Sequence, residues 1–468
     1  MFGAAPFSSL PPPVAGPLAG RHVLVLGLGD TGLSAAKWIA RQGGTVRAAD
    51  TRAAPPRGAE FRTALPGAEM HCGALELSLL EGTELVCVSP GLSLGEPLLR
   101  EAVARRVPVV GDVELFAWAL RAGPDAAVVA VTGTNGKTTV AALTGHLLRS
   151  AGVDCEVAGN IGPAALDALM KPRAAAPAVW VLELSSYQLE TTWTLEPQAA
   201  ALLNLSEDHL DRYRDLEQYA AAKARIFLGS GVQILNRDDA RSMACALPGR
   251  RIVTFGCSAP PHADDYGIGS SAAQRWLQRG EERLLALHEL PLCGLHNAAN
   301  ALAACALAQA AGVPLQALAA GLRSFRGLPH RLERVALRRG VAWYDDSKGT
   351  NVGATIAALA GLPGKSLLIA GGEGKGQDFA PLAPVVAQHA RRALLIGRDA
   401  PLIERALRPS GVPLERCESL EQAVARAAAL AVSGDAVLLS PACASFDMFR
   451  DYRHRGEVFA AAVRALGA

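Results

Sequence analysis

Residues 127–139 read AVVAVTGTNGKTT, and this stretch decides the fold class. A run of small apolar residues, 127–131, is typical of a buried β-strand. It leads directly into a glycine-containing loop, and a helical pattern follows over 140–150. Strand, glycine loop and helix in this order predict a parallel α/β sheet with a ligand site at the carboxyl end of the strand.

The loop itself predicts a phosphate site. Its backbone N–H groups can cradle phosphates, Lys137 can reach the β and γ oxygens, and the Thr138 hydroxyl can bind Mg²⁺. It is not a full P-loop, because Val131 rather than glycine stands five positions before Gly136. The alternative interpretation is a glycine-rich turn with an incidental lysine.

A second glycine turn lies near the N-terminus. The apolar run 23–26 precedes Gly27-x-Gly29-x-x-Gly32, and Asp50 ends the next predicted strand. This pattern has the form of a dinucleotide fingerprint, in which the glycines let the backbone approach a phosphate and the acid accepts from a ribose or base. The pattern does not distinguish NAD from another diphosphate such as a UDP-sugar, and a turn without a ligand remains the structural alternative.

Strands and helices alternate along the remaining chain, which predicts parallel α/β sheets throughout. We expect a loose, proline-rich tail over 1–20 and three domains at 21–117, 118–327 and 328–468. Residues 258–285 are polar and irregular, and we expect a surface excursion there. Further strands are predicted at 45–49, 85–88, 107–110, 178–182, 199–203, 342–344, 367–370, 393–396 and 436–439.

Composition excludes several classes of protein. With 468 residues, 50% of them hydrophobic, the chain can bury sizeable cores, so a wholly disordered chain is excluded. The net charge of +2 does not indicate a nucleic-acid or membrane partner, and no apolar run is long enough for a spanning helix. Nine scattered cysteines without a CxxC pair favour reduced thiols in a cytoplasmic protein.

Lysine is rare, since only seven of the 46 basic residues are lysines. Codon bias explains most of this, but each remaining lysine raises the question whether its chemistry requires an ammonium group rather than a guanidinium. Lys223 falls in a predicted amphipathic helix, a position where a lysine is usually solvated or salt-bridged. Glu183, at the end of a predicted strand, is well placed for Mg²⁺, and His209 could bind a cation or substrate.

Ten motifs, in order, resemble those of the Mur ligases from about residue 20 to the C-terminus. They are GTNGKTT (133–139), GNIG (159–162), ELSSYQLE (183–190), SEDHLDRY (206–213), QYAAAKARIF (218–227), GLHNAANALAA (294–304), GLPHRLE (327–333), DDSKGTN (345–351), GGEGKGQDF (371–379) and SPACASFDMFRDYRHRGEVF (440–459). The resemblance implies an α/β fold of three domains: a Rossmann-like N-terminal domain, a central P-loop-like ATPase domain with a parallel sheet, and a Rossmann-like C-terminal domain.

The resemblance also implies the reaction. Mur ligases use ATP to convert a carboxylate into an acyl phosphate, which an amine then attacks. DDSKGTN and the SPACASFD block favour the branch that adds D-glutamate to UDP-N-acetylmuramoyl-L-alanine in peptidoglycan precursor synthesis. Gly349, Tyr187 and Tyr452 depart modestly from the residues common in that branch. The alternatives are a folylpolyglutamate synthase-like ligase, a nicotinamide-dependent dehydrogenase on the first turn alone, or a non-catalytic nucleotide-binding protein.

Residue roles follow from the resemblance alone. Lys137, His209 and Lys223 are the implied catalytic residues, with Lys223 carried as a carbamate. The implied metal ligands for two Mg²⁺ ions are Thr138, Glu183, His209 and carbamylated Lys223. ATP contacts are implied for Gly133, Thr134, Asn135, Gly136, Lys137, Thr138, Thr139, Asn297, Asn300, Arg331 and Asp346.

Two substrate sites are implied in the same way. The UDP-substrate site takes Asp30, Thr31, Asp50, Thr51, Ser89, Gly91 and Asn160. The D-glutamate site takes Lys348, Thr350, Lys375, Ser445 and Tyr452. The implied partners are small molecules, with no nucleic acid and no membrane span, and the expected state is a cytoplasmic monomer.

Overall fold

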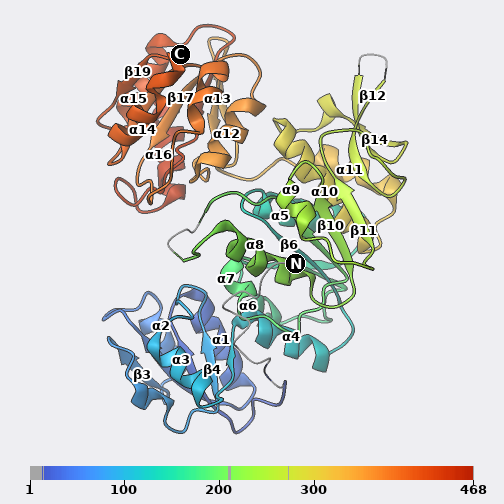
Figure 1. The fold of residues 1–468 in the computed structure, drawn as a ribbon, viewed down its shortest axis with the longest axis vertical. Helices are drawn as coiled ribbons and strands as arrows, with labels where there is room; N and C mark the ends of the chain where they lie inside the picture. The colour runs from blue at the N-terminus through green and yellow to red at the C-terminus, as the bar shows by residue number, and fades with distance from the viewer. Residues whose placement is uncertain (1–12, 14, 209–211, 272–273, 467–468) are drawn as a thin grey trace. The chain divides into compact units, whose positions relative to one another are not determined.

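The structure, a computed structural model, describes residues 13, 15–208, 212–271 and 274–466. Three α/β domains follow one another along the chain, each built on its own sheet, as the sequence predicts (Figure 1). The chain divides into two compact units: Met1–Leu285 with Ala301–Leu322, and Ala286–Asn300 with Arg323–Ala468. The first unit contains the N-terminal and central sheets, and the second contains the C-terminal sheet.

The N-terminal sheet is parallel, with the strand order β3-β2-β1-β4-β5. Its strands are β1 (His22–Leu26), β2 (Thr45–Asp50), β3 (Glu69–Cys72), β4 (Leu85–Val88) and β5 (Val109–Val110). Its helices are α1 (Asp30–Arg41), α2 (Gly58–Ala64), α3 (Pro97–Ala104), α4 (Asp112–Ala122) and the 3₁₀ turn η2 (Leu77–Leu80). Packing begins before the predicted domain boundary, because Leu18 is buried in this core.

The central sheet has the strand order β14-β13-β12-β11-β10-β9-β6-β8-β7. Its strands are β6 (Ala127–Thr132), β7 (Cys155–Gly159), β8 (Val179–Glu183), β9 (Ala199–Leu202), β10 (Val232–Asn236), β11 (Ile252–Phe255), β12 (Tyr266–Ser271), β13 (Gln274–Arg279) and β14 (Glu282–Ala286). Its helices are α5 (Lys137–Ser150), α6 (Ala165–Met170), α7 (Ser186–Leu189), α8 (Leu216–Ala224), η3 (Arg225–Phe227), α9 (Ala240–Ala244), η4 (Leu287–Glu289), α10 (Leu295–Ala310) and α11 (Leu315–Ser324).

Residues 258–285 are not the irregular excursion that we expected. They contain β12 and β13 and most of β14, which extend the central sheet, and β12 pairs with β13 in antiparallel fashion. Tyr266 and Ile268 are buried on β12, so an apolar face holds this hairpin to the domain. The interpretation failed because glycine and charged residues interrupt the apolar pattern on which strand prediction depends.

The C-terminal sheet has the strand order β15-β16-β20-β17-β18-β19. Its strands are β15 (Glu333–Arg338), β16 (Val341–Asp345), β17 (Ser366–Gly371), β18 (Ala390–Ile396), β19 (Leu414–Arg416) and β20 (Ala436–Leu439). Its helices are α12 (Val352–Gly361), α13 (Leu382–His389), α14 (Ala400–Leu407), η5 (Arg408–Ser410), α15 (Leu420–Leu430) and α16 (Tyr452–Ala465). Strand β15 runs antiparallel to β16, so the expectation of parallel sheets throughout is wrong at this edge as well.

The topology positions the candidate sites. In each sheet the strand order reverses around a central strand, where loops diverge and leave room for a ligand at the carboxyl edge. The first glycine turn follows β1, which is flanked by β2 and β4. The phosphate loop follows β6, which is flanked by β8 and β9, and the SPACASFD segment follows β20, between β16 and β17.

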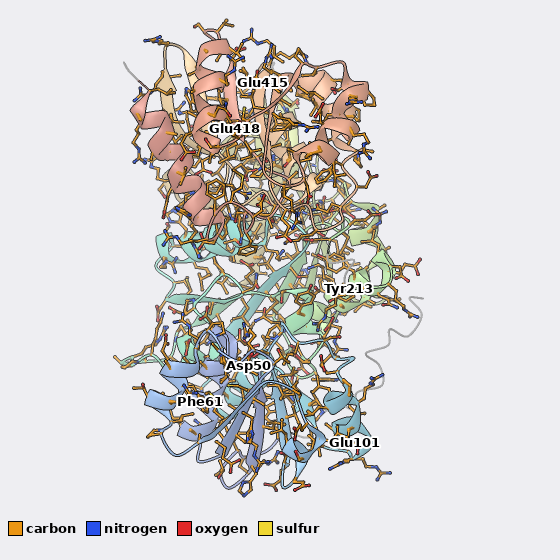
Figure 2. The ribbon with its side chains drawn as sticks, turned by 90° about the vertical axis from the view of Figure 1, so that its left-hand side faces the viewer. Asp50, Phe61, Glu101, Tyr213, Glu415 and Glu418 are labelled. Carbon is orange, nitrogen blue, oxygen red and sulfur yellow. The ribbon has the colours of Figure 1, made fainter. Side chains whose placement is uncertain are left out.

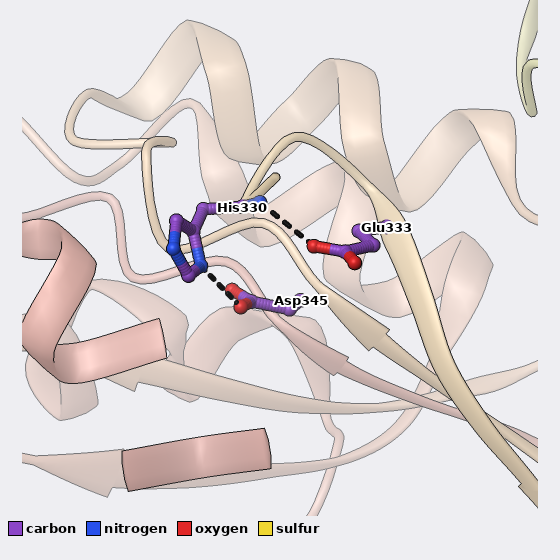
Figure 3. A group of neighbouring side chains, drawn as sticks. All are labelled: His330, Glu333 and Asp345. Carbon is purple, nitrogen blue, oxygen red and sulfur yellow. Dashed lines mark hydrogen bonds and ion pairs between the residues drawn. The ribbon is translucent and has the colours of Figure 1, made fainter. Parts of the chain in front are cut away.

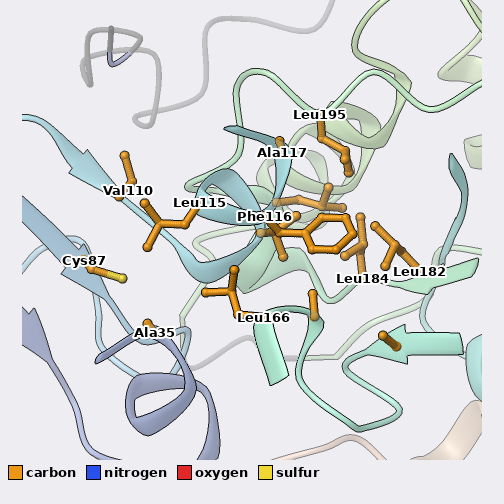
Figure 4. Close-up of a cluster of buried hydrophobic side chains, with 14 of the residues drawn as sticks. Ala35, Cys87, Val110, Leu115, Phe116, Ala117, Leu166, Leu182, Leu184 and Leu195 are labelled. Atoms are coloured by element: carbon orange, nitrogen blue, oxygen red, sulfur yellow. The ribbon is translucent and has the colours of Figure 1, made fainter. Parts of the chain in front are cut away.

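One continuous core joins the N-terminal and central domains within the first unit. Helix α4 lies between them, and its Leu115 and Phe116 are buried together with side chains from both sheets (Figure 4). Phe116 meets Trp180 of β8 edge to face, with ring centroids 5.0 Å apart. Burying this shared apolar surface explains why two domains form one compact unit. Among the described residues, no helix is long and apolar enough to cross a bilayer.

Candidate active site

The phosphate loop is held in a conformation that glycine permits. Gly136, the N-cap of α5, has a φ of 85°, and Gly133 has a φ of 153°. A Cβ on Gly133 would also approach Leu203 to 3.0 Å. The ammonium group of Lys137 folds back and donates to the carbonyl oxygens of Gly133 and Thr134, each at 2.8 Å. The loop therefore carries a positive charge directly over its own backbone, next to the positive end of α5.

Asn204, which sequence reasoning missed, braces this loop. Its Oδ1 accepts from the backbone N–H of Asn135 at 2.8 Å, its Nδ2 donates to the Asn135 carbonyl, and its carbonyl accepts from the Thr134 N–H. Asn204 follows β9, the neighbour of β6, so the brace depends on strand pairing and not on sequence spacing. The Thr134 hydroxyl lies 3.3 Å from the phenol oxygen of Tyr219, on α8.

Lys223 is buried beside the loop, with 1% of its surface exposed. Its Nζ donates to the Gly133 carbonyl at 2.9 Å, lies 3.4 Å from the Thr132 hydroxyl and sits 4.6 Å from the Tyr219 ring centroid. Burial, and then the charge of Lys137, hold the pKa of Lys223 well below its ordinary value. The helical pattern alone predicts a solvated or salt-bridged lysine, and the solvated alternative is wrong because the side chain is buried.

Glu183 ends β8 at the same edge of the sheet. Its carboxylate is 1% exposed, and Oε1 accepts from the Asn160 amide at 2.7 Å. Within the part of the chain that the structure describes, Oε2 is buried without a hydrogen-bond partner. A buried carboxylate oxygen without a partner costs folding free energy unless it binds a donor or a cation. Carboxylate oxygens are preferred ligands of hard cations such as Mg²⁺. The donors here fit Mg²⁺, with Glu183 beside the loop that carries Thr138.

Two further residues predicted for this region are Asn160 and His209. Asn160, expected on the UDP substrate, faces Glu183 in the structure. His209 lies outside the described residues. Asp208, just before it, lies near enough to raise the pKa of Lys223, which partly opposes the effect of burial.

The N-terminal turn is tightly closed. A Cβ on Gly32 would lie 1.8 Å from the Gly27 carbonyl oxygen, so only glycine fits there. The Ser89 hydroxyl, from the segment after β4, donates to the same carbonyl at 2.8 Å. Gly91, in that segment, is exposed. The structure therefore brings the first turn and the Ser89 segment together at the carboxyl edge of the sheet.

Asp50 is buried under this turn and labelled in Figure 2. Its Oδ2 accepts from the Leu28 N–H at 2.7 Å, and Arg52 pairs with the same carboxylate at 2.6 Å. Burial by itself would raise the pKa of Asp50, but the hydrogen bonds from Arg52 and Leu28 bring it to about 2. Asp30 is exposed and pairs with Arg57, while Thr31 is partly exposed and Thr51 is exposed.

A hydrogen bond joins the side chains of His330 and Asp345 in the C-terminal unit. The His330 Nδ1 lies 2.7 Å from Asp345 Oδ2, and the His330 backbone N–H donates to Glu333 (Figure 3). The hydrogen bond to Asp345 raises the pKa of His330, although burial opposes the shift. Gly456 makes room for the pair, because a Cβ there would lie 2.2 Å from His330 Nδ1. Sequence reasoning placed His330 in a motif but gave it no role.

Arg455, also missed, is fully buried in the same unit. Its guanidinium donates to the side chain and carbonyl of Ser347 at 2.9 and 2.8 Å and to the carbonyls of Cys443 and Ala444 at 3.1 and 3.3 Å. Burial lowers its pKa to about 10, still above neutral pH. Arg455 thus ties the loop after β16 to the loop after β20.

These loops carry the residues expected to hold D-glutamate. Lys348 Nζ lies 3.9 Å from the Tyr452 ring centroid, a cation–π arrangement, and Ser445 is buried. Thr350 is partly exposed. Lys375 has a φ of 51° and an exposed side chain in the loop after β17. The predicted residues therefore gather on the carboxyl edge of this sheet.

The expected ATP residues of the second unit lie at three places along the chain: before β15, after β16 and on α10. Asp346 accepts from the Ser440 hydroxyl at 2.8 Å, and desolvation raises its pKa to about 7. Arg331 is partly buried in the segment before β15. Asn297 and Asn300 are buried one turn apart on α10, and the Asn300 amide donates to Asn297 Oδ1.

Comparisons with known proteins agree with this arrangement. The chain matches three family profiles in order: "Mur ligase MurD-like, N-terminal domain" over 21–111, "Mur ligase middle domain" over 131–308 and "Mur ligase, glutamate ligase domain" over 330–443. It is 55% identical to the UDP-N-acetylmuramoylalanine--D-glutamate ligase of Nitrosospira multiformis, over 96% of this chain and 97% of the relative. It is 54% identical to the enzyme of that name from Aromatoleum aromaticum, over 96% and 98%.

Solved structures show the same fold at lower identity. MurF of Acinetobacter baumannii aligns with a TM-score of 0.60 and 19% identity, covering 95% of this chain and 91% of that one. UDP-N-acetylmuramate-alanine ligase MurC of Thermotoga maritima aligns with a TM-score of 0.59 and 20% identity, covering 96% and 100%. The N-terminal profile match does not favour a dehydrogenase, and the full-length relatives do not favour a folylpolyglutamate synthase. The chain belongs to the Mur ligase family of ATP- and Mg²⁺-dependent amide ligases, enzymes that act on small molecules.

Proposed function

We propose that this chain joins D-glutamate to UDP-N-acetylmuramoyl-L-alanine, converting ATP to ADP and phosphate, in peptidoglycan precursor synthesis. The observation that carries the reaction class is the cluster of Lys137, Lys223 and the orphaned Glu183 oxygen at the carboxyl end of the central sheet. The choice of D-glutamate is supported by relatives that are 55% and 54% identical over nearly the whole chain and carry that name.

The reaction balances in two steps. An oxygen of the substrate carboxylate forms a bond to the γ-phosphorus of ATP, ADP leaves, and an acyl phosphate results. The amine of D-glutamate then attacks the acyl carbon, phosphate leaves, and the nitrogen loses its proton. Charge stabilisation and positioning dominate such chemistry, which suits a site of fixed cations rather than a protein nucleophile.

Lys137 and the backbone N–H groups of the loop would bind the phosphoryl group while it is transferred. The Lys137 ammonium donates to two uncharged loop carbonyls in the structure. Because a hydrogen bond to an anionic oxygen is stronger than one to a carbonyl, the ammonium can turn to the phosphate oxygens when ATP binds. Gly133, Thr134, Asn135, Gly136 and Thr139 complete the cradle. Thr138 and Glu183 would hold Mg²⁺, which when bound supplies charge neutralisation of the phosphate oxygens.

We extend the proposal to carbamylation of Lys223. A buried amine whose pKa is strongly lowered can attack CO₂ as a nucleophile. In this reaction the N–C bond forms and the nitrogen loses a proton. The product is an anionic oxygen ligand, which arginine could not provide at this position. The carbamate of Lys223 and His209 would be protein ligands of a second Mg²⁺ ion.

The remaining assignments follow the domains. Residues 21–117 take the UDP substrate, residues 118–327 take ATP, and residues 328–468 take D-glutamate and part of ATP. In the first we assign contacts to Asp30, Thr31, Asp50, Thr51, Ser89 and Gly91, with Asn160 from the central domain. In the last we assign D-glutamate contacts to Lys348, Thr350, Lys375, Ser445 and Tyr452, and ATP contacts to Arg331 and Asp346, joined by Asn297 and Asn300. The substrates point to a cytoplasmic enzyme, and a monomer suffices for the chemistry.

The test is phosphate release from ATP with UDP-N-acetylmuramoyl-L-alanine and, separately, D-glutamate, L-glutamate, L-alanine and a diamino acid. We expect release that depends on D-glutamate and an amide product of the matching mass. Equal release with another amino acid, or none with D-glutamate, would overturn the assignment. Replacing ATP by a nicotinamide cofactor should give no reaction.

A further inference from the structure

Arg212 connects the N-terminal domain to the central domain within the first unit. One of its guanidinium nitrogens, Nη1, donates to the carbonyl oxygens of Leu92 at 2.7 Å and Pro90 at 3.3 Å. The other, Nη2, pairs with Glu190 at 2.5 Å. The guanidinium carbon lies 4.4 Å from the ring centroid of Tyr187, and only 10% of the side chain is exposed.

The N-terminal partners of Arg212 belong to the segment that closes the first glycine turn. Ser89, one residue before Pro90, donates to the Gly27 carbonyl. A Cβ on Gly27 would lie 2.9 Å from the Cβ of Ser89 and 3.5 Å from a Leu92 methyl, so the segment packs directly against the turn. Fixing the carbonyls of Pro90 and Leu92 therefore fixes the wall of the cradle that Ser89 and Gly91 form.

The central partners of Arg212 belong to the segment that carries the proposed metal ligand. Glu190 immediately follows α7, which begins three residues after Glu183, and its carboxylate is fully buried. The Tyr213 hydroxyl donates to the second oxygen of Glu190 at 2.6 Å, and Tyr213 is labelled in Figure 2. Arg212 is thus held rigidly on the central side, by an ion pair that neither water nor salt can easily screen.

We propose that Arg212 is a positioning residue that sets the Ser89–Leu92 wall of the UDP-substrate cradle against the central catalytic segment. This inference rests on the proposed function, and it adds a residue whose contacts, within the described part of the chain, are with Pro90, Leu92, Glu190 and Tyr187. The guanidinium suits the task because its planar fork reaches a carboxylate on one side and two carbonyls on the other. A lysine ammonium would keep the charge and lose the fork.

The test compares Arg212→Lys with Arg225→Lys in the full-length enzyme. Arg225 is a matched control, because its guanidinium is also largely buried and donates to carbonyls of the neighbouring segment, those of Leu189 at 2.7 Å and Thr192 at 2.5 Å. Its guanidinium carbon lies 5.4 Å from the Trp193 ring centroid, and its two hydrogen-bond acceptors, Leu189 and Thr192, belong to the central domain. Both variants remove a buried arginine, but only the first loosens the cradle wall.

For Arg212→Lys we expect the KM for UDP-N-acetylmuramoyl-L-alanine to rise about tenfold, the effect of losing two carbonyl hydrogen bonds, while the KM for ATP changes little. Arg225→Lys should leave the KM for the UDP substrate within about twofold of the wild-type value. Combining Arg212→Lys with Ser89→Ala should raise the KM by less than the product of the single effects, because both act through one wall. Equal KM changes in the two arginine variants, or multiplicative effects with Ser89→Ala, would overturn the proposal.

Calorimetric titration with UDP-N-acetylmuramoyl-L-alanine separates this proposal from the proposed function. If the wild type binds the compound but shows no D-glutamate-dependent turnover, the amino-acid assignment fails, and the affinity ratio of the wild type to Arg212→Lys still tests the wall. A ratio near tenfold supports the positioning role, and a ratio near one overturns it. A wild type that does not bind the compound overturns both.

Discussion

Lys137 and Lys223 donate to the same backbone oxygen, the carbonyl of Gly133, at 2.8 and 2.9 Å. Two ammonium groups on one acceptor repel each other, and the repulsion falls on the more buried of the two. Lys223 is 1% exposed, and burial followed by the charge of Lys137 holds its pKa well below the ordinary value. Burial and the neighbouring ammonium of Lys137 therefore both shift the Lys223 amine toward its neutral form.

The first prediction concerns the Lys223 amine. Lys223→Ala should reduce kcat at least about a hundredfold, the effect typical of removing one charge-stabilising group from an active site. Lys223→Arg should fail as well, because a guanidinium neither loses its proton nor takes up CO₂. A short carboxylic acid added to Lys223→Ala should restore part of the activity by supplying the missing anionic oxygens. Phosphate release with and without the acid measures this.

Lys365→Arg is the matched control for these variants. The Lys365 ammonium lies at the surface and donates to the carbonyls of Ala387 and Gln388, which a guanidinium can also reach. We expect its activity to be unchanged, and the same holds for Lys37→Arg and Lys171→Arg. An unrescued Lys223→Ala with full activity would show that neither the amine nor its carbamate takes part.

The second prediction contrasts two buried glutamates. Glu183 has an oxygen without a partner among the described residues, whereas both oxygens of Glu190 are paired, with Arg212 and Tyr213. Glu183→Gln should raise the Mg²⁺ concentration needed for activity and leave the Tm unchanged or higher, since it removes an incompletely paired buried charge. Glu190→Gln should lower stability by about 3–5 kcal/mol, because it leaves Arg212 without its counter-ion.

Thermal melts without metal and Mg²⁺ titrations of phosphate release measure the two effects. A Glu183→Gln protein that melts well below the wild type would mean that the carboxylate serves the fold rather than a cation. An unchanged Mg²⁺ requirement would remove Glu183 from the proposed ligands.

Local spacing in the sequence was enough to predict the glycine turns, their strands and the three-domain α/β class. Gly27 and Gly133 have positive φ angles, and Lys137 donates to the carbonyls of Gly133 and Thr134, so what makes these turns is local and visible in the sequence. Arg455 and Asn204 were missed because their partners come from other loops, brought close only by strand order. A buried arginine with carbonyl partners has no sequence signature, since arginine is the commonest basic residue here and most such residues lie at the surface.

The third prediction follows from the hydrogen bond between His330 and Asp345. The hydrogen bond raises the pKa of His330 above its unfolded value of about 6.5, so its contribution to stability is complete below that pH. The contribution is lost as the pH rises through the folded pKa. The Tm difference between the wild type and His330→Gln should therefore be largest near pH 6 and should shrink on the alkaline side.

Melting curves from about pH 6 to pH 9 test this sign. His262→Gln, at an exposed position of the first unit, is the control for replacing a surface histidine, and the pH dependence of the His330 variant is compared with it. A difference that grows toward alkaline pH would mean that the neutral imidazole is the form stabilised by folding.

The last prediction concerns Arg455, which joins Ser347 to the carbonyls of Cys443 and Ala444. Arg455→Lys cannot serve all of these acceptors at once, and each carbonyl left without a donor costs about 1–3 kcal/mol. The loops that carry Lys348 and Ser445 should then no longer be held in fixed positions relative to each other. The KM for D-glutamate should therefore rise about tenfold or more, while the KM for the UDP substrate should stay unchanged. Steady-state kinetics with each substrate varied in turn measures the difference.

Arg416→Lys, at an exposed arginine paired with Glu404, is the control and should change neither KM. If Arg455→Lys folds with a lower Tm but an unaltered KM for D-glutamate, Arg455 stabilises the domain without shaping the amino-acid site.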